Sequence, residues 1–167
     1  GRNRFNLEYL TDVIILDQEI SRYETSFIDH TESLIRACIN INPEYERLYF
    51  MLADTLARKK DYEEAIEIAS NIAAQNPVND IKYFELALIA ILSSRDDVAS
   101  SALEKVKALR MTEYGYSSAD KNIILDGGEL RRLAQIYLDT NRFYDAIHSY
   151  QQVIAYLQEN SPEAALI

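Results

Sequence analysis

Apolar residues between positions 49 and 72 recur at the spacing i, i+3, i+4 and i+7, first in one run and again after a polar break at 58–60. The first run is Tyr49, Leu52, Ala53 and Leu56, and the second is Ala65, Ile68, Ala69 and Ile72. Residues at this spacing share one face of an α-helix. The pattern therefore predicts two amphipathic helices joined by a short turn.

The same pattern returns further along the chain at a fixed offset. Five pairs lie 34 residues apart: Tyr49 and Tyr83, Leu52 and Leu86, Ala53 and Ala87, Ala65 and Ala99, and Pro43 and Pro77. Four more pairs lie 47 residues apart: Leu86 and Leu133, Ala87 and Ala134, Ala99 and Ala146, and Val106 and Val153. Since 47 is 34 plus 13, one insertion of 13 residues in a repeating helix pair explains both offsets.

Local signals suggest where the helices of each unit begin. Asn42-Pro43 and Asn76-Pro77 place a capping side chain before a proline that suits a first helical turn, and Asp61 with Glu64 has the spacing of a capping box. Asp126-Gly127-Gly128 has the composition of a turn. The alanines that recur in each unit leave room for the paired helices to approach closely.

These residues resemble the tetratricopeptide repeat, a family of stacked helix hairpins. The resemblance is best over 46–79, with further units at 80–113 and 127–160 and an insertion at 114–126. It implies an all-α fold, a right-handed superhelix of antiparallel helix pairs, in one continuous domain. The insertion has two interpretations: a connection that packs on its neighbouring helices, or a flap over a binding groove.

The two ends of the chain extend this pattern. Residues 1–45 suit a degenerate helix pair, whose first helix carries the apolar stripe Phe5, Tyr9, Val13, Leu16, Ile20 and Tyr23. Residues 161–167 begin as a helix does, with Ser161 and Pro162, and then stop. We expect a truncated helix there, and an open apolar face that permits end-to-end self-association.

Composition narrows the function classes. The 167 residues carry 27 acidic and 17 basic side chains, a net charge of −10, which disfavours a nucleic-acid partner. The longest apolar run, residues 86–92, is too short to cross a membrane, and the N-terminus shows no signal-peptide pattern. We expect a cytoplasmic protein, with the extracytoplasmic face of a membrane protein as the alternative.

Candidate chemistry is sparse. His30 and His148 lie in different units, and the single Cys38 occupies a packing position of its helix. No set of nucleophile, base and orienting group appears, nor a set of metal ligands at a familiar spacing. The sequence predicts a non-catalytic protein without cofactor or metal.

Binding is what remains, because the first helices of stacked hairpins line a concave surface. The register assigns eleven residues to this groove: Arg47, Phe50, Asp54, Arg58, Ile81, Phe84, Leu88, Ile91, Arg131, Gln135 and Leu138. The middle of the groove is then apolar, which suits a hydrophobic peptide or helix of a partner. The alternative is that the chain itself covers these apolar residues, since the helix around Tyr83–Leu92 is hydrophobic nearly all round.

Two functions follow from the resemblance. The first is a scaffold that binds a protein or peptide in the groove. Some family members grip a carboxylate-terminated peptide with Lys and Asn, but Phe50, Asp54, Glu85 and Gly128 stand at four of those positions here, and Arg132 is the one basic match. The alternative is a soluble accessory domain of a larger bacterial membrane enzyme of cell-surface polysaccharide assembly, since residues 39–49 and 83–87 resemble the repeat tails of O-antigen ligase and polymerase-like proteins.

Overall fold

The computed structural model describes residues 2–21, 25–114 and 125–160, and in these ranges the chain is helical, with no strand. The elements are α1 (Arg2–Ser21), η1 (Thr25–Phe27), α2 (Ile28–Ile41), α3 (Glu46–Lys59), α4 (Tyr62–Gln75), α5 (Asp80–Leu92), α6 (Asp96–Tyr114), α7 (Gly127–Asp139) and α8 (Phe143–Asn160). The all-α prediction is confirmed. Most of the predicted insertion, 115–124, and the predicted helix start at 161–167 lie outside the described residues.

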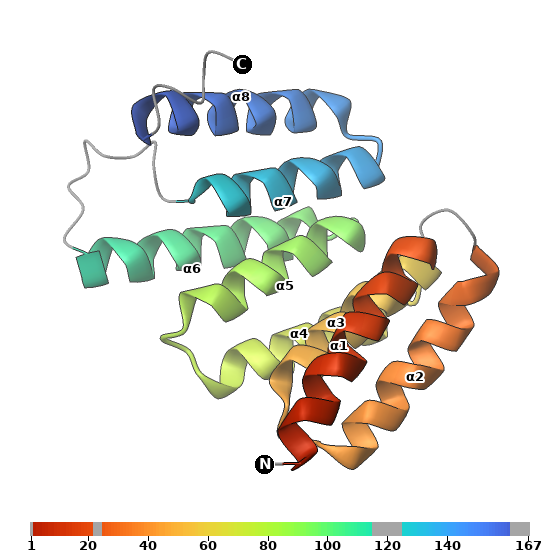
Figure 1. Ribbon diagram of the computed structural model, residues 1–167. Coiled ribbons are helices and arrows are strands. Elements are labelled where there is room, and N and C mark those ends of the chain that lie inside the picture. The colour runs from red at the N-terminus through yellow and green to blue at the C-terminus, as the bar shows by residue number, and fades with distance from the viewer. Residues whose placement is uncertain (1, 22–24, 115–124, 161–167) are drawn as a thin grey trace. The chain divides into compact units, whose positions relative to one another are not determined.

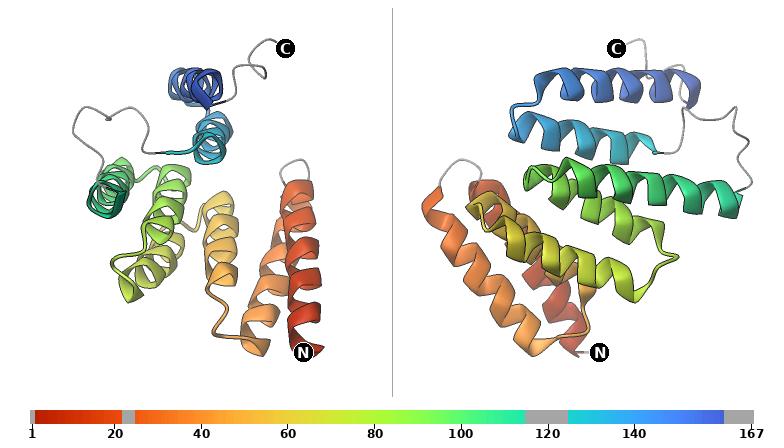
Figure 2. Two further views of the ribbon diagram at one scale, coloured as in Figure 1. Left: turned by 60° about the vertical axis from the view of Figure 1, so that its left-hand side comes forward. Right: turned by 180° about the vertical axis from the view of Figure 1, so that it is seen from behind.

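Two compact units make up the chain, residues 1–77 and 78–167, and each is described by itself. In unit 1, α1 packs on α2, α2 on α3, and α3 on α4. In unit 2, α5 pairs with α6, α7 pairs with α8, and α5 also packs on α7. Consecutive helices run antiparallel within each pair, as Figures 1 and 2 show.

The repeating alanines are buried in all three hairpins. All six are at most 5% exposed: Ala53, Ala65, Ala87, Ala99, Ala134 and Ala146. A methyl side chain lets two helix backbones approach more closely than a larger residue would, so each hairpin closes around these positions. The burial of these alanines agrees with the close packing of paired helices that the sequence predicts.

The turn inside each hairpin has the same backbone geometry in all three repeats. Lys60, Ser94 and Asn141 adopt positive φ angles of 72°, 56° and 60°. Each is followed by a residue whose N–H donates to a carbonyl five residues back, with N···O distances of 2.9, 2.8 and 2.7 Å for the pairs Asp61–Leu56, Arg95–Ala90 and Arg142–Tyr137. This is the Schellman arrangement, formed here without glycine. It repeats at the 34- and 47-residue offsets of the sequence.

The capping predictions were wrong in their details. Asn42 and Asn76 end α2 and α4 rather than begin the next helices, and Asn79 caps α5 by accepting a hydrogen bond from the Lys82 N–H at 3.2 Å. Asp61 precedes α4, but its side chain makes no cap hydrogen bond. Its ψ angle is 61°, whereas an N-cap side chain reaches the helix from an extended backbone.

A complete capping box lies at Asp126 instead, where the sequence predicted a turn. Asp126 accepts from the Glu129 N–H at 2.8 Å, and the Glu129 carboxylate accepts from the Asp126 N–H at 3.0 Å. Gly127 is therefore the first residue of α7. A Cβ atom on Gly127 would lie 2.9 Å from the ring of Tyr156 on α8, so the glycine permits a close approach of these two helices.

Helix α1 forms as predicted, but its apolar stripe does not face the rest of unit 1. Tyr9 and Leu16 are exposed, whereas Thr11 and Ile14 are buried. A polar contact contributes to the buried side: the Gln18 amide donates to the Met51 carbonyl and to the Thr55 hydroxyl of α3, both at 3.1 Å. Helical spacing identified the helix but not which of its faces is buried.

Charged side chains connect the helices of unit 1. Lys59 of α3 lies 2.7 Å from Asp29 and 2.6 Å from Glu32 of α2, and its hydrogen bonds to them raise the pKa of the ammonium group. Arg36 lies 2.7 Å from Glu32 and 2.9 Å from Glu64 of α4. The hydrogen bond from Lys59 lowers the pKa of Glu32, and Arg36 adds to this effect against the opposing effect of burial.

Arg110 has the corresponding role in unit 2, where it joins three helices. From α6 it donates two hydrogen bonds of 2.7 Å to Glu129 of α7 and one of 2.5 Å to Asp80 of α5. All three side chains are less than 20% exposed, and the bonds to Glu129 are the largest cause of the raised pKa of Arg110. Both carboxylates stand in first helical turns, where the helix dipole also favours negative charge.

The left-handed turns predict a stabilising substitution. We expect Ser94→Gly to raise the free energy of unfolding by about 0.5 to 1 kcal/mol, because glycine adopts a positive φ without the strain of a side chain. Asn141→Gly, the matched control, should change it by less, since asparagine tolerates this conformation. Urea unfolding followed by circular dichroism measures both, and an unchanged or lower midpoint for Ser94→Gly would contradict the assignment.

The lowered pKa of Glu32 predicts a pH-dependent stability. Its carboxylate stabilises the fold fully above its unfolded pKa, near 4.5, and this contribution disappears as pH falls through the lower folded value. Glu32→Gln should therefore cost about 1 to 2 kcal/mol at pH 7 and progressively less below pH 4.5. The exposed Glu44, substituted in the same way, is the control, and a cost for Glu32→Gln that does not depend on pH argues against the ion network.

Candidate protein-binding surfaces

The residues assigned to a groove in unit 1 lie along α3, and we call Arg47, Phe50, Asp54 and Arg58 the α3 surface. Arg47 is exposed, and the other three are partly exposed. Arg58 donates from Nε to Asp54 at 2.9 Å and from Nη2 at 3.3 Å, a bidentate pair one helical turn apart. This pairing leaves little net charge at the middle of the surface, so Phe50 and Arg47 provide its contact chemistry.

The residues assigned to unit 2 divide into exposed and buried sets. Ile81 of α5 is 60% exposed, and Arg131 and Leu138 of α7 are exposed as well. Gln135, on the same side of α7, is half-buried and donates to Asp139 at 2.8 Å. We call these four residues the α5–α7 surface. It combines two apolar side chains with one basic and one amide group.

The apolar residues expected in the middle of the groove are interior. Phe84, Leu88 and Ile91 are 1%, 4% and 2% exposed. The run from Leu86 to Leu92 is buried at every position, because α5 contacts α6 on one side and α7 on another. These three residues therefore belong to the core rather than to an open surface, and their assignment to the groove is corrected.

An ion pair between α5 and α7 lies beside Phe84. Arg132 donates to both carboxylate oxygens of Glu85, at 2.6 and 2.8 Å, and its guanidinium lies 5.6 Å from the centre of the Phe84 ring. The one basic residue at a carboxylate-gripping position is thus already paired within the chain. Sequence reasoning missed this pair, although opposite charges at positions 85 and 132, one repeat offset apart, were a usable signal.

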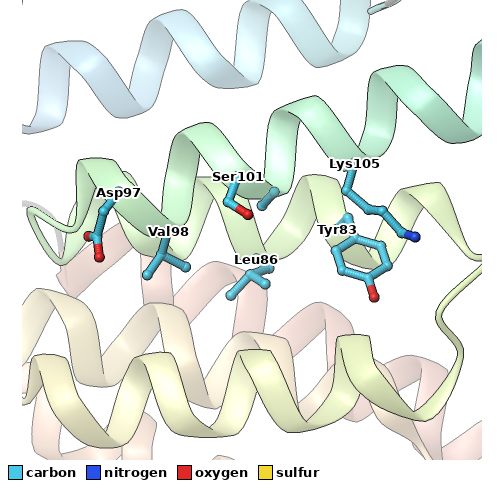
Figure 3. Close-up of a pocket in the computed structure, with 7 residues that line it drawn as sticks. Tyr83, Leu86, Asp97, Val98, Ser101 and Lys105 are labelled. Atoms are coloured by element: carbon cyan, nitrogen blue, oxygen red, sulfur yellow. The ribbon is translucent and has the colours of Figure 1, made fainter.

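A pocket of about 420 Å³ lies on the α5–α6 hairpin, lined by Tyr83, Leu86, Asp97, Val98, Ser101, Ala102 and Lys105. Figure 3 shows Tyr83 and Lys105 at one end and Asp97 at the other, with Leu86 and Val98 between them. The Lys105 ammonium lies 5.8 Å from the centre of the Tyr83 ring. Hydrogen bonds from Arg95 lower the pKa of Asp97 to about 2, so this carboxylate is ionised near neutral pH and is a weak base.

Reactive groups elsewhere have ordinary structural roles. Cys38 is buried, and burial raises the pKa of its thiol, which keeps it protonated and unreactive. His30 makes a 2.8 Å contact with Asp17, which joins α2 to α1. Within the described ranges, no three His, Cys, Asp or Glu side chains gather closely enough to hold a metal ion. In the same part of the chain no helix combines the length and apolar character needed to cross a membrane.

Comparisons with known proteins agree with the repeat. Residues 46–70 match the family model described as tetratricopeptide repeat. The crystal structure of MamA is similar over 94% of this chain and 81% of that chain, at 13% sequence identity and a TM-score of 0.50. TTC0263, a thermophilic TPR protein in Thermus thermophilus, aligns over 92% of both chains at 17% identity and a TM-score of 0.48. A search of curated proteins finds no significant match.

The family-model match shows a tetratricopeptide repeat at residues 46–70, and the similarity to MamA shows a fold of the tetratricopeptide-solenoid class. Proteins with this fold are generally non-catalytic scaffolds for protein interaction. At sequence identities this low, the similarity shows a common fold and does not show that the proteins bind the same partner. The resemblance to O-antigen ligase and polymerase tails has no support in these matches.

The burial of the apolar residues predicts how substitutions in α5 behave. We expect Phe84→Asp and Leu88→Asp each to destabilise the protein by about 3 kcal/mol or more, since each removes a core side chain and buries a carboxylate. Ile81→Asp, on the same helix but exposed, should cost less than about 1 kcal/mol. Thermal unfolding followed by circular dichroism compares the three variants. An unfolding midpoint for Phe84→Asp equal to that of the wild type would contradict its place in the core and support its assignment to the binding surface.

Proposed function

We propose that this protein is a non-catalytic scaffold that binds a protein or peptide through the first helices of its repeats. The observation that carries the proposal is the exposure of Ile81, Arg131 and Leu138 at positions that the repeat register assigns to the binding face. Apolar side chains exposed at such positions cost free energy in water, and a bound partner would recover it.

The composition of the α5–α7 surface indicates the chemistry of the partner. Ile81 and Leu138 suit aliphatic or aromatic anchors, and the exposed Arg131 suits an acidic group between or beside them. Gln135, already bonded to Asp139, can still accept a hydrogen bond from a peptide N–H through its carbonyl oxygen. An apolar peptide or amphipathic helix with an acidic residue fits this set.

The α3 surface of unit 1 supports a second, weaker contact area in the same proposal. Arg47 and Phe50 are accessible there, while the Asp54–Arg58 pair is internally satisfied.

The test begins with affinity capture by the purified protein and identification of the captured chain by mass spectrometry. A peptide from that chain is then titrated by calorimetry against the wild type and against the double variant Arg131→Glu, Leu138→Glu. We expect at least a tenfold loss of affinity, because both side chains would lie at the centre of the contact. Both residues are exposed, so the fold should be retained.

Glu104→Lys, an exposed charge change on α6, is the matched control and should leave the affinity unchanged. Equal affinity of the double variant and the wild type would show that the partner binds elsewhere and would reject the α5–α7 surface.

A further inference from the structure

The outer side of α8 presents a row of large apolar side chains to solvent. Phe143, Ile147 and Ile154 are 58%, 59% and 56% exposed, and their spacing of four and seven residues places them on one face of the helix. Tyr150 lies on the same face, between Ile147 and Ile154. Tyr144, which follows Phe143 in the chain, is 85% exposed. We call Phe143, Ile147, Tyr150 and Ile154 the α8 stripe. The adjoining side of α8, with Ala146, Ser149 and Val153, is buried, and α8 packs on α7.

Helix α8 also lacks the charges that cover the other second helices. Between positions 143 and 158 it contains one charged residue, Asp145, which pairs with Arg142 at 2.9 Å. By contrast, α4 exposes Glu63, Glu64 and Glu67. In a protein with a net charge of −10, the α8 stripe is therefore a place where another acidic molecule can approach without like-charge repulsion.

We propose that the α8 stripe binds a second copy of this chain, with α8 packing against α8 about a two-fold axis. Such an interface is self-complementary, because each copy contributes the same surface. An antiparallel pairing centred near Tyr150 brings Ile147 of one copy opposite Ile154 of the other, and the opposed helix dipoles make this direction favourable. The two Tyr150 side chains then lie at the centre of the interface, between the two Ile147–Ile154 pairs.

The other exposed apolar stripe, on α1, is a poorer site for self-association. Tyr9 and Leu16 are exposed there, but Asp12 and Glu19 flank them and are exposed as well. Pairing α1 with α1 would bring these acidic groups together. Pairing α1 with α8 would remove water from the Asp12 carboxylate and place it against a helix that carries no Lys or Arg. Charge thus selects the pairing of α8 with α8.

The area available fits a weak dimer. An aromatic side chain buries about 150 to 250 Å² when fully covered, so the half-exposed stripe and Tyr144 together offer roughly 400 to 500 Å² in each copy. The total of about 800 to 1,000 Å² lies below the roughly 1,200 Å² at which stable specific interfaces begin, in the range of weak, transient ones. We therefore expect dissociation in the micromolar range, with monomer and dimer both present at ordinary concentrations.

Sedimentation velocity between about 1 and 200 μM tests the proposal, since this range brackets a micromolar dissociation constant. The mass should rise with concentration from 19.2 kDa towards twice that value. The double variant Ile147→Glu, Ile154→Glu should remain monomeric throughout, with an unchanged circular dichroism spectrum because both side chains are exposed. Leu16→Glu on α1 is the matched control and should dimerise as the wild type does.

Three results would overturn the proposal: a wild type that stays monomeric over the whole range, a dimer that survives the double substitution in α8, or a dimer abolished by Leu16→Glu. The monomeric α8 variant should still bind the peptide partner of the α5–α7 surface with wild-type affinity. Loss of dimerisation is thereby distinguished from failure of the proposed scaffold function.

Discussion

Each hairpin depends on the close approach of two helices at paired alanines, and the other features of the fold accommodate this approach. Ala53 and Ala65 are fully buried, and a methyl group at such positions permits a short distance between the helix axes. The chain must then reverse within a few residues. The left-handed residue between the helices achieves this reversal, and its hydrogen bonds satisfy the carbonyls at the end of the first helix. Three hairpins repeat this solution although their turn residues are Lys60, Ser94 and Asn141.

Several basic side chains connect helices in this acidic protein. Lys59 holds two carboxylates of α2, Arg110 joins three helices of unit 2, and Arg132 joins α5 to α7. Partly buried pairs such as those of Arg110 are screened less by salt than exposed pairs are. Because the Arg132 guanidinium is already bonded to Glu85, it is a poor anchor for a partner's carboxylate. The proposed binding surface therefore differs in its chemistry from the Lys and Asn grip of terminal carboxylates.

Periodicity predicted the helices, their pairing and the buried alanines, because residues that make the same contact in every unit recur at the same offset. It could not predict contacts that differ between units. The faces of α1 and α5 are examples: Leu16 has core spacing but is exposed, whereas Phe84 has a groove position but is buried. Which face is covered depends on neighbouring helices, and a helical pattern does not contain this information. Capping failed at Asp61 for a related reason, since the turn that precedes α4 fixes a backbone angle unsuited to capping.

In the second helix of the last described repeat, the apolar or polar character of the side chains does not follow their exposure, as it does in the other second helices. At three equivalent positions α4 has Tyr62, Ile66 and Ala73, which are partly or fully buried, and α6 has the polar Asp96, Ser100 and Lys107. In both helices the character of the side chains follows their exposure. In α8 the same positions hold Phe143, Ile147 and Ile154, which are apolar and yet more than half exposed. Packing within the described chain accounts for the side chains of α4 and α6 at these positions, but it does not account for the exposed apolar side chains of α8. Covering α8 with an additional molecule would therefore remove apolar surface from water.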